Sequence, residues 1–150
     1  MNFEKQINND IKTAMRAKDK DTLRSLRAIK SGILLAKTAD GGSDELSEAA
    51  VIKMLAKMVK QRKDAAAIFE QQNRADLAAK EMVEVNVIQK YLPEQLDEAT
   101  IKAKIAEIIA QTGASSMRDM GKVMGMANKA MAGKAEGKLI ANIVKQLLQS

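Results

Sequence analysis

The sequence predicts an all-α protein: an N-terminal bundle of about four helices, followed by a small three-helix domain. Apolar residues recur at helical spacing along the chain, with almost no strand-like alternation. The strong helix formers Ala, Leu, Met, Lys, Glu and Gln dominate, and proline, which breaks helices, occurs once in 150 residues. Hydrophobic residues make up 46% of the chain, so a folded core is expected rather than disorder.

Two apolar stripes predict the first two helices. Apolar residues fall four apart over residues 3–15 and recur at helical spacing over residues 23–34. Asp21 lies between the stripes and is a suitable N-cap for the second helix. Residues 40–44, which are rich in Asp and Gly, form the clearest loop in the chain.

The third and fourth helices are predicted from their boundaries. Ser47 or a near neighbour is expected to begin the third helix, with Glu48 near its positive N-terminal end. A weakly marked turn near residues 72–74 separates it from the fourth helix. Pro93 ends that helix, because the residue before a proline avoids helical geometry.

Three shorter helices are predicted after the proline. Asp97 is a suitable cap for the first of them, and Gly113 is its expected left-handed stop. Ser115 or Ser116 caps the second, a Met-rich helix that ends at Gly133, and the last helix follows Gly137. We therefore divide the chain into an N-terminal bundle, residues 1–93, and a C-terminal domain, residues 94–150. One continuous bundle is the alternative.

The chain has no Cys and no His, which excludes several classes of chemistry. Disulfides, thiolate nucleophiles and acyl-transfer triads that need His are ruled out. We expect no metal site and no cofactor, because the commonest metal ligands are missing. A Ser–Lys dyad is the remaining nucleophile, but the candidate serines suit helix caps and helix surfaces better: Ser25, Ser31, Ser115 and Ser116. No autonomous catalysis is expected.

No targeting or membrane segment is expected in this sequence. Polar residues interrupt the start of the chain, and the longest apolar runs are far shorter than the roughly 20 residues that span a bilayer. The absence of Cys fits a reducing compartment. We therefore expect a cytoplasmic protein with no membrane partner.

The net charge of +6 is unevenly distributed. Residues 53–63 contain five basic and no acidic side chains, and residues 111–150 contain six basic side chains against Asp119 and Glu136. Basic faces attract polyanions through phosphate contacts, although an ordinary solvated helix surface is the alternative interpretation. Because aromatic residues make up only 2% of the chain, stacking on single strands is not expected, and a nucleic acid would be bound by its folded shape.

Two glycines and one tyrosine stand out from this pattern. Gly121 and Gly125 lie inside the predicted Met-rich helix, where each costs about 1 kcal/mol relative to Ala. Either a neighbouring helix packs closely against them, or the backbone of a ligand approaches them. Tyr91, next to the proline, is expected to anchor the junction between the domains.

Four stretches of the chain form a recognisable set of motifs: Leu23–Lys30 (LRSLRAIK), Lys60–Asp64 (KQRKD), Arg74–Glu81 (RADLAAKE) with Tyr91–Pro93 (YLP), and Asp119–Met124 (DMGKVM) with Gly133–Lys138 (GKAEGK). They resemble the YqeY-like proteins, a family whose C-terminal part is related to the tail domain of the B subunit (GatB) of tRNA-dependent amidotransferases. The resemblance covers nearly the whole chain in the family's order. Asn73, where glycine is usual, and Glu136, where aspartate is usual, are mild departures.

The resemblance implies a helical bundle followed by a module that, in the amidotransferase and in some glutaminyl-tRNA synthetases, touches the outer corner of tRNA. It extends that role to residues 113–150 only. The implied contacts there are Arg118, Lys122, Lys129, Lys134 and Lys138, with Gly121 allowing close approach. Lys60, Arg62 and Lys63 match the family's basic motif in the other domain and complete the nucleic-acid candidates.

Three functional hypotheses follow. The first is a tRNA-binding accessory module without catalysis of its own. The second is a helical module that docks to an aminoacyl-tRNA synthetase, an amidotransferase or the ribosome through a Met-lined surface between the last three helices. The third and weakest is carbon–nitrogen ligase activity, with glutamine as amido-N-donor, within a complex. The amidotransferase's kinase-like fold and its separate amidase subunit are both missing from these 150 residues.

Overall fold

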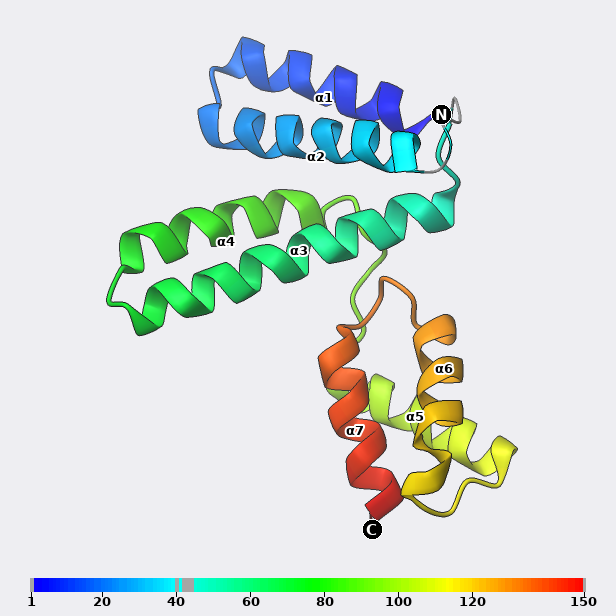
Figure 1. Ribbon diagram of the computed structural model, residues 1–150. Helices are drawn as coiled ribbons and strands as arrows, with labels where there is room; N and C mark the ends of the chain where they lie inside the picture. The colour runs from blue at the N-terminus through cyan, green and yellow to red at the C-terminus, as the bar shows by residue number, and fades with distance from the viewer. Residues whose placement is uncertain (1, 40, 42–44, 150) are drawn as a thin grey trace. The chain divides into compact units, whose positions relative to one another are not determined.

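The computed structural model describes residues 2–39, 41 and 45–149, and its helices are labelled in Figure 1. These residues form seven α-helices and one 3-10 helix, with no β-strand among them, which confirms the all-α prediction. The chain forms two compact units, Met1–Pro93 and Glu94–Ser150. In the described part of the chain, no helix combines the length and the apolarity needed to cross a bilayer. Most of the predicted loop, residues 40 and 42–44, lies outside the described residues.

The N-terminal unit contains four helices in two layers. Helices α1 (Phe3–Ala17) and α2 (Lys20–Ala39) lie side by side, and α3 (Glu48–Gln71) and α4 (Ala75–Gln89) form the second pair (Figure 1). Helix α4 packs against both α3 and α2. Burial of aliphatic side chains between the layers supplies the main stabilisation. The most deeply buried are Ile7, Leu26, Ile29, Leu55 and Ile88.

Local signals set most helix boundaries in this unit, but one predicted cap differs from the structure. Ser47 caps α3 as predicted, because its hydroxyl oxygen accepts a hydrogen bond from the Ala50 amide at 3.1 Å. The prediction that Asp21 caps α2 was wrong. Lys18 ends α1 in the left-handed conformation, and Asp19 directly after it accepts from the Thr22 amide at 3.1 Å. Asp21 therefore lies in the first turn of α2.

The turn between α3 and α4 lies where the sequence predicted it. Asn73 adopts a φ of 58°, in the left-handed region that glycine occupies without strain. Asparagine is among the few other residues that tolerate this conformation, because its short polar side chain can bond locally. Asn73 thus supports a left-handed turn at the position where the resemblance stated above implies Gly.

The C-terminal unit is a small three-helix core. It consists of α5 (Glu98–Thr112), the 3-10 helix η1 (Met117–Asp119), α6 (Met120–Ala130) and α7 (Gly137–Gln149). The three long helices pack against one another around an aliphatic interior. Its fully buried members include Ile101, Ile105, Val123, Ala127, Met131, Ile140 and Val144.

The boundaries of α5 are those predicted. Asp97 caps the helix by accepting from the Thr100 amide at 2.7 Å, and Gly113 ends it with a φ of 70°. Ser116, rather than Ser115, caps η1. Helix α6 ends at Ala130, three residues before the predicted stop, and the left-handed Gly133 lies in the turn that follows.

Candidate nucleic-acid interface

Helix α6 has one face in the core and one face in solvent. Val123 and Ala127 are fully buried, and Met120 and Met124 pack against the same core. Because a helix repeats about every 3.6 residues, side chains at complementary positions point outward. This outer face of α6, together with the preceding η1, consists of exposed residues only: Arg118, Gly121, Lys122, Gly125, Met126 and Lys129.

The two glycines of the outer face have no packing role within the unit. A Cβ atom built on Gly121 or Gly125 would meet nothing within 4 Å. At Gly32, by contrast, a Cβ would lie 3.2 Å from the sulfur of Met54 and 3.3 Å from that of Met58. Close helix packing therefore explains Gly32, and as an account of Gly121 and Gly125 it was wrong.

The two remaining basic candidates of this unit lie beyond the end of α6. Lys134 belongs to the turn before α7, and its carbonyl accepts from the Leu96 amide at 2.8 Å. The Gln95 side chain donates to the Gly133 carbonyl at 2.6 Å, so this turn is tied to the segment before α5. Lys138 stands in the first turn of α7, where the helix dipole disfavours a cation and no acidic residue accompanies it.

The cations of the C-terminal unit have no acidic partners among the described residues. All ion pairs among the described residues lie in the N-terminal unit. The aspartates of the C-terminal unit serve the backbone instead. The hydrogen bonds from Thr100 hold the pKa of Asp97 below its ordinary value, and Asp119 accepts from the Ser115 amide at 3.0 Å. The positive charge on the outer face of α6 is therefore left uncompensated.

The basic motif of the N-terminal unit is only partly available to a ligand. Lys60 is exposed and lies 3.5 Å from the Asp64 carboxylate, whereas Lys63 is half-buried. Arg62 is directed into the unit, where its Nε lies 3.9 Å from the Glu84 carboxylate and its Nη1 donates to the Met58 carbonyl at 3.2 Å. This geometry makes Arg62 a residue that joins α3 to α4.

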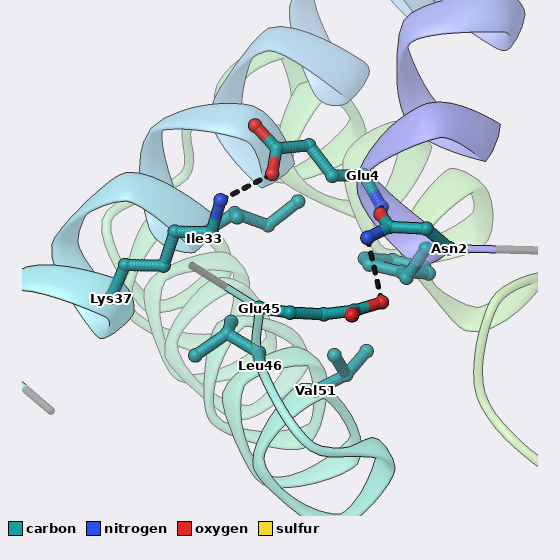
Figure 2. A pocket seen from close by; sticks show the side chains of 8 residues that line it. Asn2, Glu4, Ile33, Lys37, Glu45, Leu46 and Val51 are labelled. Carbon is teal, nitrogen blue, oxygen red and sulfur yellow. Dashed lines mark hydrogen bonds and ion pairs between the residues drawn. The ribbon is translucent and has the colours of Figure 1, made fainter. Parts of the chain in front are cut away.

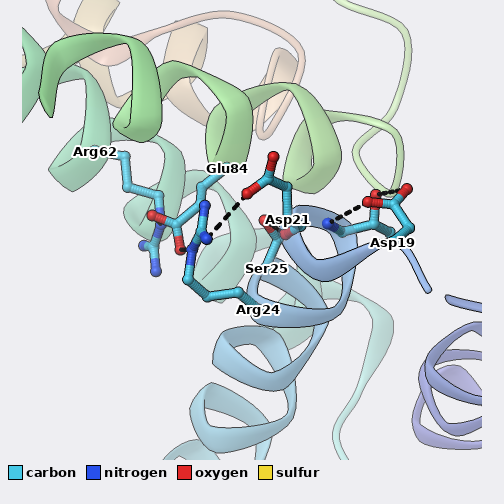
Figure 3. A network of polar contacts seen from close by, with 7 residues as sticks. Asp19, Asp21, Arg24, Ser25, Arg62 and Glu84 are labelled. Carbon is cyan, nitrogen blue, oxygen red and sulfur yellow. Dashed lines mark hydrogen bonds and ion pairs between the residues drawn. The ribbon is translucent and has the colours of Figure 1, made fainter. Parts of the chain in front are cut away.

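Figure 3 shows a second arginine at the same carboxylate. Arg24 of α2 lies 3.8 Å from Glu84 and also pairs with Asp21, one turn away on its own helix, at 3.0 Å. Three helices thus meet at one glutamate. Sequence reasoning missed this cluster, because Arg24, Arg62 and Glu84 lie in separate segments and nothing in their spacing indicates a contact.

Tyr91 anchors the end of the N-terminal unit to α1. Its ring meets Phe3 edge-on with centroids 5.9 Å apart, and its hydroxyl donates to the Asp10 carboxylate at 2.5 Å. Burial, reinforced by this hydrogen bond, raises the pKa of the Tyr91 hydroxyl. The sequence predicted an anchor between domains. The contacts found here lie within one unit.

Near the N-terminus, α1, α2 and α3 enclose a cavity of about 20 Å³ (Figure 2). An ion pair between Lys37 and Glu4 at 2.5 Å and a hydrogen bond from Asn2 to Glu45 at 2.7 Å cross its edges. The cavity has room for little more than a water molecule, which is too small for a ligand site.

Comparison with known proteins gives a family and several fungal relatives. The family model described as Yqey-like protein matches residues 4–148. Proteins named "Altered inheritance of mitochondria protein 41, mitochondrial" are similar to this chain in three yeasts. The Lachancea thermotolerans protein is 34% identical over 107 residues, which is 70% of this chain and 57% of that protein. The Clavispora lusitaniae protein is 42% identical over 113 residues, 71% of this chain and 62% of that protein. The Meyerozyma guilliermondii protein is 33% identical over 129 residues, 82% of this chain and 65% of that protein.

The chain spans about three-fifths of the length of these curated relatives. Their names place those proteins in mitochondria, whereas the sequence predicted a cytoplasmic protein here.

Proposed function

Since the chain belongs to the YqeY-like protein family, we propose that it is a tRNA-binding accessory module that works without catalysis of its own. The outer face of α6 carries this proposal. It combines exposed cations that have no acidic partner among the described residues with two helical glycines whose Cβ positions are open. The resemblance of residues 113–150 to the amidotransferase tail supplies the ligand class, the outer corner of folded tRNA.

The physical logic is that of phosphate recognition. Lys122 and Lys129 are two helical turns apart and point the same way, so both can meet one strand of a sugar-phosphate backbone. A glycine beside them removes the side chain that would hold that backbone away from the helix. Such contacts read shape and charge rather than sequence, so binding should weaken steeply with salt.

Location follows from the ligand. We place this activity in a compartment that holds tRNA: the cytoplasm, as the sequence predicts, or the mitochondrion for which the fungal relatives are named. The binding chemistry is the same in either compartment.

The test compares purified protein binding to folded tRNA and to duplex DNA of equal charge, at salt concentrations from about 50 to 300 mM. We expect tRNA to bind several-fold better. The triple variant Lys122→Ala, Lys134→Ala, Lys138→Ala should lose most of that preference. The control triple variant removes the same charge from exposed lysines elsewhere in the unit: Lys102→Ala, Lys104→Ala and Lys145→Ala. Equal losses in both triples would refute a defined interface.

Gly121→Ala provides a second test, because its effects on stability and binding should differ in sign. The added methyl group meets nothing within 4 Å, so the substitution should stabilise the helix by about 0.5–1 kcal/mol. If a ligand backbone approaches this position, the same substitution weakens tRNA binding. Unchanged tRNA affinity in the stabilised variant would argue against close approach at Gly121.

A further inference from the structure

A second recess of the N-terminal unit is large enough for a ligand. It lies between the first turns of α1 and α3 and the segment 91–93, and its volume is about 640 Å³. Binding pockets typically measure about 300–1,000 Å³, so this groove falls within the usual range. Phe3, Leu46, Val51 and Ile52 contribute apolar surface to it.

The charged groups that line this groove are both negative. Glu45 and Glu48 both line it, and no lysine or arginine does. Glu45 accepts a hydrogen bond from the Asn2 amide group, and across the described residues neither carboxylate has a cation within ion-pair distance. The groove is therefore acidic and partly apolar, on a chain whose net charge is +6.

We propose that this groove docks a segment of a partner protein that carries apolar side chains flanked by lysine or arginine. The apolar surface would bury the aliphatic side chains, and the two carboxylates would pair with the flanking cations. The amide of Gln6, which also lines the groove, can bond the peptide backbone. Nucleic acid is excluded as the occupant, because both carboxylates would face its phosphates.

This docking site differs in place from the one expected from the sequence. Around the last three helices, Met131 is fully buried and Met120 and Met124 pack against the core, whereas Met117 and Met126 are each 40% exposed. The groove is lined entirely by residues of the N-terminal unit. Peptide docking at the groove is therefore independent of tRNA binding by the C-terminal unit.

Tyr91 makes the test direct, because it is the sole tyrosine of a chain without tryptophan and it lines the groove. The full-length protein is titrated with a short synthetic peptide of leucine and lysine, free of aromatic residues, while Tyr91 fluorescence is recorded. A matched peptide with glutamate in place of lysine serves as the comparison. We expect saturable binding of the lysine peptide and none of the glutamate peptide.

Two variants isolate the contribution of the carboxylates. Glu45→Gln combined with Glu48→Gln should raise the dissociation constant for the lysine peptide about fivefold, as expected for two exposed charge pairs. The control, Glu70→Gln combined with Glu98→Gln, makes the same change in net charge at exposed positions outside the groove and should bind like the unmodified chain. Glu48→Lys should shift the preference toward the glutamate peptide.

Three results would overturn the proposal. The first is equal binding of the two peptides, and the second is equal affinity of the double variant and its control. The third is a Tyr91 signal that changes with protein concentration alone, because a second copy of the chain would then fill the groove.

Discussion

Replacing Glu84 by glutamine tests whether the arginines around it are structural. The substitution keeps the shape of the side chain and removes its charge. Arg24 and Arg62 would then face each other across a neutral amide, with Nη2 of Arg24 and Nε of Arg62 already buried without a hydrogen-bond acceptor in the described structure. A partly buried cation that loses its counter-charge destabilises the folded state.

The magnitude can be worked from the two distances. At an effective dielectric constant of about 20, opposite unit charges 3.8–3.9 Å apart attract by about 4 kcal/mol. That gross value must be reduced, because the Arg24 side chain is 39% exposed and has Asp21 as a second partner. The Arg62 side chain is only 18% exposed, so solvent screens its attraction to Glu84 less. We expect Glu84→Gln to lower the free energy of unfolding by about 2 kcal/mol.

The assay is urea denaturation monitored by the fluorescence of Tyr91. This signal reports on the N-terminal unit alone, because Tyr91 lies in that unit and is the only tyrosine. A loss of this size corresponds to a midpoint lower by roughly 1 M urea. Glu81→Gln, one turn earlier on α4 and without an ion pair among the described residues, is the matched control. It should stay within about 0.5 kcal/mol of the unmodified chain. If both variants unfold at the same midpoint, the cluster contributes no stability.

Substitutions at three further positions test local features of the fold. The raised pKa of Tyr91 means that the unfolded chain loses this proton first, so stability should fall as pH rises above the ordinary value of 10.0; in Tyr91→Phe this part of the alkaline loss should be absent from thermal unfolding curves. At the left-handed turn, Asn73→Ala should destabilise the N-terminal unit by about 1 kcal/mol, while Asn73→Gly should stay close to neutral, as urea midpoints would show. The pKa of Asp97 is lowered, so the stability it contributes is present above its unfolded-state value of 3.8 and is lost as pH falls through the folded-state pKa. Asp97→Asn keeps an acceptor for the Thr100 amide and should remove that acid dependence, measured by amide exchange in α5.

Short-range features of the fold could be predicted from the sequence. Ser47, Asp97 and Gly113 act on backbone groups within a few residues of themselves, so residue type and position were enough to place the ends of α3 and α5. The cap of α2 could not be placed in this way, and Asp19 was found there in place of the predicted Asp21. The position of the cap depended on where α1 ended, and Lys18 takes a left-handed conformation that its residue type does not favour.

The candidate site was only partly predictable for the same reason. The exposure of Lys122 and Lys129 follows from the apolar stripe on the opposite face of α6, which is visible in the sequence. The role of Arg62 is not visible there, because it stands in a run of basic residues while its partner Glu84 comes from the next helix.

Residue types and their spacing along the chain set the helical class, the amphipathic faces and the separation of acidic from basic segments. Which of these groups meet depends on the tertiary structure. Folding brings Arg62 to Glu84 and leaves Gly121 and Gly125 facing open space. It also forms an acidic groove between the first turns of α1 and α3 and the segment 91–93. Contacts between helices depend on packing between residues that are distant in the chain, and no local pattern encodes them.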